Sequence, residues 1–285
     1  MKVWKSTVVA VLMSVVSSAS AGVYDAVRAK AEMTLVATGT IDVSPDGTVT
    51  AYTLDEAAKL PPAVRKVTDR AAASWRFEPV LVDGKAVPAR TRMSLRIIAR
   101  KSADADTYEI EIAKADFRVD TPPEERPNRR KIERPVYPMP AARSDMGGVV
   151  YIVAKIGRDG RVVDAFAEQV NLTTVDRERA MDGWRNMLAN AALRAAREWT
   201  FDPPTRGDEV DEPFWQVRIP FSFIAQGRSA PSYGQWELYV PGPRQRAPWM
   251  NAADFDASSS DAIAGDDIAP VGKGMLRLLT SLNGS

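Results

Sequence analysis

Hydrophobic and polar positions show strand-type alternation followed by helix-type spacing in two parts of the chain. Residues 33–43 and 149–156 are rich in β-branched residues, and each run leads to an Asp-Gly pair and then to a second alternating run, 48–52 and 161–166. Asp-Gly between two such runs predicts a β-hairpin, because a tight two-residue turn requires positive φ. A calcium loop would need several spaced oxygen ligands, which neither stretch provides. We therefore expect a hairpin in each part and no metal site.

Each predicted hairpin is followed by an apolar stripe with helical spacing. The first stripe begins after Pro61-Pro62, which are tolerated at a helix start. The stripes consist of Val64, Val67, Ala71 and Trp75 in the first part, and of Trp184, Leu188, Ala191, Ala195 and Trp199 in the second. Such one-face stripes bury against a sheet. We expect core positions for Trp75, Phe77, Trp184, Trp199 and Phe201; a functional aromatic pocket is the alternative for Trp75 and Trp199.

A third strand is predicted after each helix, at residues 93–98 and 214–224. In the second of these, Val217, Ile219, Phe221 and Phe223 alternate onto one face. The predicted fold class is α+β, with two small domains that each consist of a three-stranded antiparallel sheet packed by one helix.

The two parts share motifs as well as periodicity. Asp-Gly occurs at 46–47 and recurs at 159–160, and Trp-x-Phe-x-Pro occurs at 75–79 and recurs at 199–203. A separation above 100 residues indicates duplicated domains, because solenoid repeats have periods of roughly 20–50 residues. The expected domains are residues 30–113 and 135–226.

Two segments lack a pattern that could bury a core. Residues 114–134 are rich in proline and charge, which predicts an extended linker. Residues 227–285 are rich in Gly, Pro, Ser and Asp without sustained periodicity, and we expect this C-terminal tail to be disordered.

The N-terminus, residues 1–21, has the pattern of a secretory signal peptide. Lys2 and Lys5 precede an apolar stretch at 8–16, and small residues follow at 19–21. Cleavage after Ala21 would place the mature chain in the periplasm. An uncleaved inner-membrane anchor is the alternative, although a span needs about 20 predominantly apolar residues.

Composition narrows the function classes. The whole chain has a net charge of +1, and removing residues 1–21 takes away two lysines, which gives −1. Such a balanced charge gives no reason to expect nucleic acid as a partner, and a membrane partner is expected only if the N-terminus is uncleaved. The chain has no Cys and no His. Disulfides are therefore excluded, and the commonest general base and metal ligand are missing.

The second copy resembles the C-terminal domain of the TonB family over about 90 residues. The matching residues are Pro135-Val136-Tyr137-Pro138, Ala142-Arg143, Gly148 and the strand to Ile156, Asp159-Gly160-Arg161-Val162, Ala191-Ala192, Trp199-Thr200-Phe201-Asp202-Pro203 and the strand to Phe223. The first copy looks like a diverged version that lacks the Tyr-Pro lead-in.

The resemblance implies a role in contacting outer-membrane receptors or other envelope proteins. In the family, the last strand adds an extended receptor segment to its edge, beside the Tyr-Pro region. The partner contacts that the resemblance implies are Tyr137, Pro138, Phe214, Gln216, Val217, Arg218, Ile219, Phe221 and Phe223. No cofactor is implied.

The chain departs from a family energy transducer, which has an uncleaved membrane helix with a His and a long proline-rich linker. We therefore expect a periplasmic adaptor protein; an anchored transducer component for transport across the outer membrane is the alternative. A His-independent hydrolase is a third hypothesis, which would need a Ser-Lys pair or two carboxylates at a recognisable spacing. No stretch provides either, so we expect no enzyme and no catalytic residue.

Overall fold

The computed structural model describes residues 31–102, 107–225, 227–257, 259–265, 267–272 and 274–283. The predicted signal peptide, residues 1–21, lies outside these ranges. Among the described residues, no helix has the length and apolar character needed to span a bilayer. The α+β class expected from the sequence is confirmed, and the sheets are antiparallel.

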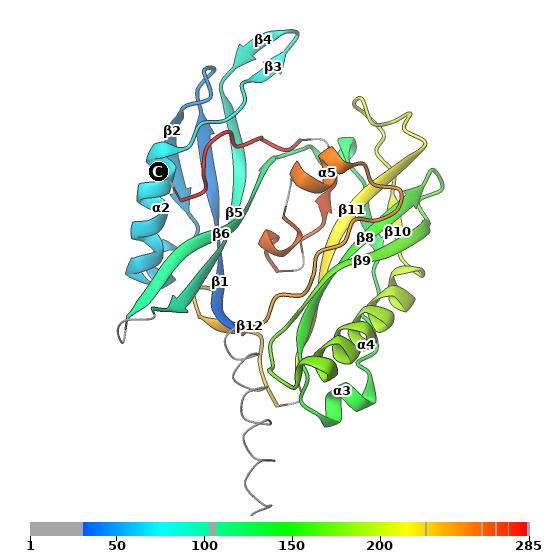
Figure 1. The fold of residues 1–285 in the computed structure, drawn as a ribbon. Helices are drawn as coiled ribbons and strands as arrows, with labels where there is room; N and C mark the ends of the chain where they lie inside the picture. The colour runs from blue at the N-terminus through cyan, green and yellow to red at the C-terminus, as the bar shows by residue number, and fades with distance from the viewer. Residues whose placement is uncertain are drawn as a thin grey trace, which may run out of the picture.

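The first sheet has the strand order β12-β1-β5-β6, with β2 paired to the other end of β1 (Figure 1). Its strands are β1 (Glu32–Val43), β2 (Val49–Leu54), β5 (Ala89–Lys101), β6 (Tyr108–Val119) and β12 (Glu237–Tyr239). The second sheet has the order β13-β11-β8-β9. Its strands are β8 (Gly148–Gly157), β9 (Val162–Leu172), β11 (Phe214–Phe223) and β13 (Ala269–Pro270).

One long helix covers the outer face of each sheet, and the C-terminal tail runs between the sheets (Figure 1). The long helices are α2 (Pro62–Ser74) and α4 (Glu178–Ala196), and the short ones are α3 (Met139–Arg143) and α5 (Ala252–Ala257). The remaining short elements are η1 (Ala57–Lys59), η2 (Pro123–Glu125), η3 (Ser260–Ala262), β3 (Val80–Val82), β4 (Lys85–Val87), β7 (Asn128–Lys131) and β10 (Thr200–Asp202).

The recurring Asp-Gly and Trp-x-Phe motifs contact each other in both copies. The Phe77 N–H donates to the Gly47 carbonyl at 2.8 Å, and the Phe201 N–H donates to the Gly160 carbonyl at the same distance. Both glycines have positive φ. A Cβ on Gly47 would stand about 2 Å from the Phe77 carbonyl oxygen, and a Cβ on Gly160 would stand equally close to that of Phe201. The turn needs glycine for its φ and for this close approach, which explains why the two motifs recur together.

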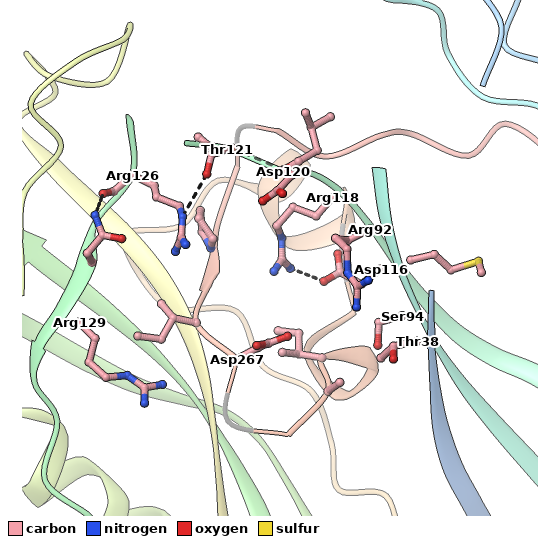
Figure 2. Close-up of a pocket in the computed structure, with 17 residues that line it drawn as sticks. Thr38, Arg92, Ser94, Asp116, Arg118, Asp120, Thr121, Arg126, Arg129 and Asp267 are labelled. Atoms are coloured by element: carbon pink, nitrogen blue, oxygen red, sulfur yellow. Dashed lines mark hydrogen bonds and ion pairs between the residues drawn. The ribbon is translucent and has the colours of Figure 1, made fainter. Parts of the chain in front are cut away.

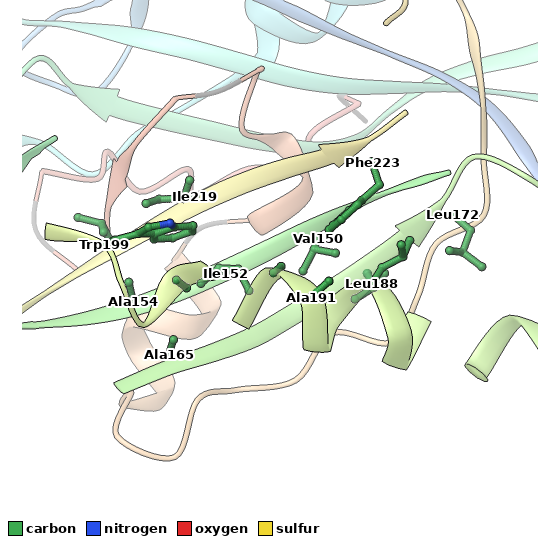
Figure 3. Packing of buried hydrophobic residues seen from close by; sticks show 14 of the residues in the cluster. Val150, Ile152, Ala154, Ala165, Leu172, Leu188, Ala191, Trp199, Ile219 and Phe223 are labelled. Carbon is green, nitrogen blue, oxygen red and sulfur yellow. The ribbon is translucent and has the colours of Figure 1, made fainter. Parts of the chain in front are cut away.

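The expected aromatic core residues lie between each sheet and its helix. Trp75, Phe77, Trp199 and Phe201 are at most 1% exposed, and Figure 3 shows Trp199 within the core of the second sheet. Trp184 is only partly buried, and its indole N–H donates to the Asp176 carboxylate at 2.8 Å. It therefore lies at the margin of this core.

The segment predicted as a linker is largely docked. Strand β6 runs to Val119, because its alternation of apolar and charged residues continues six residues into the range 114–134. Strand β7 pairs with β10, and the Glu133 carbonyl accepts the Trp199 indole N–H at 3.0 Å. Proline and charge signalled an extended chain, but extended chain also pairs at a sheet edge. The first sheet consequently has one more long strand than predicted.

The prediction of a disordered tail is corrected by the structure. Residues 237–239 form β12 on the first sheet, and residues 269–270 form β13 on the second. Leu276 is buried in the first core, and Leu282 packs against it. Each of these tail segments is too short to produce a periodic signal, but each completes an element that is distant in the sequence.

A buried polar network connects the two sheets through the tail. The Arg96 guanidinium on β5 donates to the Tyr151 hydroxyl on β8 at 3.2 Å and also to the Asp261 carbonyl in the tail. The Asp261 carboxylate accepts the Tyr239 hydroxyl and, at 3.3 Å, the Gln169 side chain. Burial raises the pKa of Tyr151 to about 12. The sheets and the tail are therefore joined by satisfied buried groups, in contrast to the expected separate domains on a flexible linker.

Candidate functional site: the outer edge of β11

Strand β11 has one complete edge and one nearly open edge. On the inner side it pairs with β8 over its whole length, from Phe214 opposite Gly157 to Phe223 opposite Gly148, without a register shift. On the outer side β13 covers only Val217 and Arg218. Within the described part of the chain, no strand pairs with the outer side of residues 219–223.

The hydrogen-bonding register of the outer edge follows from one contact. The Gln216 carbonyl accepts the Val271 N–H at 3.0 Å, so the backbone groups of Gln216 point outward. Because direction alternates along a strand, those of Arg218, Pro220 and Ser222 also point outward. Pro220 fits this register, since a proline within a sheet is tolerated where its missing N–H faces an open edge.

Most of the predicted contact side chains on β11 belong to the core. Val217, Ile219 and Phe223 are at most 6% exposed and pack in the hydrophobic cluster under α4. Phe221 is partly buried and stacks on Trp199 with ring centroids 4.8 Å apart. The prediction that these side chains contact a partner is therefore corrected, because the core occupies that face; a partner could reach only their backbone.

Arg218 is also inaccessible, although the alternating pattern places it on the opposite face. Its side chain is fully buried, and it donates to both carboxylate oxygens of Glu168 on β9, which is equally buried. Arg244 from the tail also contacts this carboxylate, at 2.7 Å. Arg218 therefore holds a buried ion pair under the tail instead of offering a surface contact.

The other two predicted positions on β11 lie toward its start. Phe214 and Gln216 are partly buried, and the Lys155 ammonium lies 4.2 Å from the centroid of the Phe214 ring. The Gln216 Oε1 atom is buried without a hydrogen-bond partner.

The Tyr137 ring lies beside the far end of β11. The Tyr137 ring is 5.7 Å from the Phe223 ring, and its hydroxyl donates to the Met146 carbonyl at 2.7 Å. Burial raises the pKa of this hydroxyl. Pro138 occupies the N-cap position of α3. The structure therefore places the Tyr137 ring against the last residue of β11, with Pro138 next to it in the chain.

Replacing Tyr137 with phenylalanine should remove the hydrogen bond to Met146 and leave the ring contact with Phe223 in place. We expect a loss of about 0.5–1.5 kcal/mol in the free energy of unfolding, measured by urea denaturation. Tyr137→Ala should cost more, because it also removes the ring. Equal stability of wild type and Tyr137→Phe would contradict the assigned hydrogen bond.

A cavity of about 680 Å³ opens beside β13, between β6, β7 and the tail (Figure 2). Guanidinium groups and carboxylates alternate on its walls, including Arg118, Arg126, Asp120 and Asp267. Asp267 and Pro270 belong to the tail segment that carries β13, so that segment separates the cavity from the β11 edge.

Charges of both signs line this cavity. Asp116 and Arg118 on β6 form an ion pair, and burial raises the pKa of the carboxyl and lowers that of the guanidinium. The Asp116 Oδ1 and Arg118 Nε atoms are buried without a hydrogen-bond partner. Since the opposite charges nearly balance, the cavity provides no strong field that would select a single ion.

The chain matches no family model, no curated protein and no solved structure. Its function is therefore argued from the geometry of the β11 edge.

Sequence reasoning missed the residues that define this edge. Ser222 is exposed, and its backbone N–H and C=O point outward. It was not singled out because a polar residue at this position fits the apolar-polar alternation of the strand. Val271 and Ala269 lie in the tail, where two residues of strand are too few to show alternation. Glu168 could have been noticed as an acidic residue just after the alternating run 161–166, which predicts either an exposed face or a buried partner.

Proposed function

We propose that this chain is a periplasmic adaptor protein that captures an extended segment of an envelope protein, such as an outer-membrane receptor, by strand addition to β11. The open stretch of the β11 edge is the observation that carries the proposal. From Pro220 to Phe223 the strand is fully paired on its inner side, while its outer backbone groups have no strand beside them within the described ranges. Such an edge is a template for another strand.

The resemblance of residues 135–226 to the TonB C-terminal domain supports the same proposal. The resemblance implies that the last strand presents its edge beside the Tyr-Pro region. Here β11 is the last long strand of its sheet, and Tyr137 contacts Phe223 at the open end of that edge. Affinity would come from the backbone ladder, because most side chains of β11 are committed to the core.

A photo-crosslinking amino acid at Ser222 tests this function in cells. Ser222 is exposed and its N–H points outward, so a captured segment should crosslink there. The matched control is Val163 on β9, which is 60% exposed and lies away from β11. We expect a crosslinked envelope protein from position 222 and none from position 163. The same crosslinks from both positions would contradict the proposal.

Ser222→Pro should then block the capture. The substitution removes an outward donor but no bond to β8, so the inner ladder stays intact. We expect partner binding about tenfold weaker, equivalent to about 1.4 kcal/mol, with an unchanged melting temperature. Ser222→Ala, which keeps the N–H, should bind like wild type. Wild-type binding by a folded Ser222→Pro variant would show that this edge is not the interface.

A further inference from the structure

The tail pairs with the outer edge of both sheets. Val271 donates its N–H to Gln216 on β11. A few residues later the Val119 N–H on β6 donates to the Gly274 carbonyl at 2.7 Å, and Leu276 donates to Phe117 at 2.9 Å. The chain therefore already places its own extended segments where a partner strand would add.

The backbone pairing of β13 with β11 is short. The strand has two residues and pairs on one side only, while Asp267, Ile268 and Pro270 line the cavity of about 680 Å³. Gly265 and Gly272 flank the segment with positive φ, and glycines readily absorb the backbone changes that a hinge requires. Releasing the segment therefore breaks few backbone hydrogen bonds, and it also withdraws Ile268 from the second core and Val271 from its apolar cluster.

The seated segment also indicates which residues the edge accepts. Ala269 lies opposite Arg218 and is fully buried, so a larger side chain at this position would have to displace its neighbours. Pro270 lies opposite Val217, in a pair where no N–H points toward β11. Val271 packs in an apolar cluster with Trp249 and Val153.

We propose that residues 268–271 are an internal occupant of the β11 edge, and that the partner is an extended segment of the same pattern that displaces them. This inference rests on the proposed function and adds the partner's chemistry. The partner would carry a small residue opposite Arg218 and a β-branched apolar residue two positions later, as Ala269 and Val271 do. The position between them tolerates proline.

Tethering gives the internal occupant an advantage over a free segment. A short connection raises the effective concentration of a linked segment to the millimolar range. A free peptide therefore competes poorly until the internal strand is released, and releasing the strand should strengthen peptide binding without any new contact. The tail therefore controls the access of a partner strand to β11.

Three forms of the full chain differ in whether β13 is released from β11, locked onto it, or free to exchange. Val271→Pro removes the N–H that Gln216 accepts, which releases β13. The double variant Val217→Cys with Pro270→Cys places thiols on a directly opposed pair, whose Cα spacing suits a disulfide. Because the chain has no other Cys, oxidation can form only this lock, and reduction restores the starting state. Wild type is the third form.

The probe is a fluorescently labelled peptide with the sequence of residues 267–272, titrated against each form. We expect binding to Val271→Pro at least about tenfold tighter than to wild type, and no binding to the oxidised lock. The control peptide, with leucine in place of the alanine that corresponds to Ala269, should bind about tenfold more weakly to the released form. Amide hydrogen exchange of residues 216–218 should be faster in Val271→Pro than in wild type.

The outcomes separate this inference from the proposed function. Equal peptide affinity for the locked and released forms, or unchanged exchange at residues 216–218 in Val271→Pro, overturns the internal occupant. If crosslinking from position 222 persists in that case, the proposed function stands alone. If exchange is faster in the released form but neither the peptide nor an envelope protein binds it, strand addition at β11 is wrong, and this inference fails with it.

Discussion

Replacing Glu168 with alanine is expected to destabilise the protein by about 3–5 kcal/mol. Glu168 and Arg218 are both fully buried, and the guanidinium donates to both carboxylate oxygens. The substitution leaves a buried cation without this carboxylate, and the remaining guanidinium cannot reach water. Urea denaturation followed by circular dichroism measures the loss.

A double variant separates the cost of a broken pair from the value of the pair itself. Glu168→Leu combined with Arg218→Met replaces both charges with apolar groups, and Arg244 is 23% exposed, so it can turn toward solvent. We expect this variant to regain most of the stability that Glu168→Ala loses, because replacing a whole buried pair is often neutral or stabilising. A loss below 1 kcal/mol in Glu168→Ala would show that the Arg218 charge is solvated.

Trp199→Ala is the second substitution with a large expected effect, again about 3–5 kcal/mol. The Trp199 side chain is 1% exposed, stacks on Phe221, and donates its indole N–H to the Glu133 carbonyl at 3.0 Å. Alanine would leave a cavity under β11 and an unsatisfied carbonyl on the docked segment. Thermal and urea denaturation should both show the loss.

Trp184 offers the matched control for this experiment. It belongs to the same apolar stripe but is only partly buried, and its indole N–H donates to the Asp176 carboxylate at the margin of the core. Trp184→Ala should therefore cost clearly less than Trp199→Ala. Equal losses would mean that the second core extends further toward the start of α4 than its packing indicates.

The local elements of both copies could be predicted from the sequence because their signals are local. The Asp-Gly turns, the helical stripes and the last strand each depend on residues within one window, and β1, α2, β8, α4 and β11 all appear near their expected positions. The pairing of Gly47 with Phe77 could not be predicted as a contact, although the shared motif spacing reflected it.

The docked segments escaped prediction because their partners are remote. Residues 237–239 pair with the start of β1, residues 32–34, and two or three residues carry no periodicity. The tail covers the inner face of the second sheet. It buried Arg218, which the alternation of β11 had assigned to an accessible face. The covering of part of the outer side of β11 by β13 had no signal in the sequence, and the register of that side required the contact between Val271 and Gln216.

The first core can be completed only after the tail has been synthesised, because the tail packs against the first sheet. The Trp75 indole N–H donates to the Leu282 carbonyl, 207 positions later in the chain, and Leu276 fills the same core. At a synthesis rate of about 5–20 residues per second, roughly 10–40 s separate the appearance of these two partners. During that interval the first sheet exposes apolar surface that nothing in its own segment can cover. A chain interrupted before residue 276 would keep that surface open, so damaged products should be recognisable to proteases by their incomplete N-terminal half.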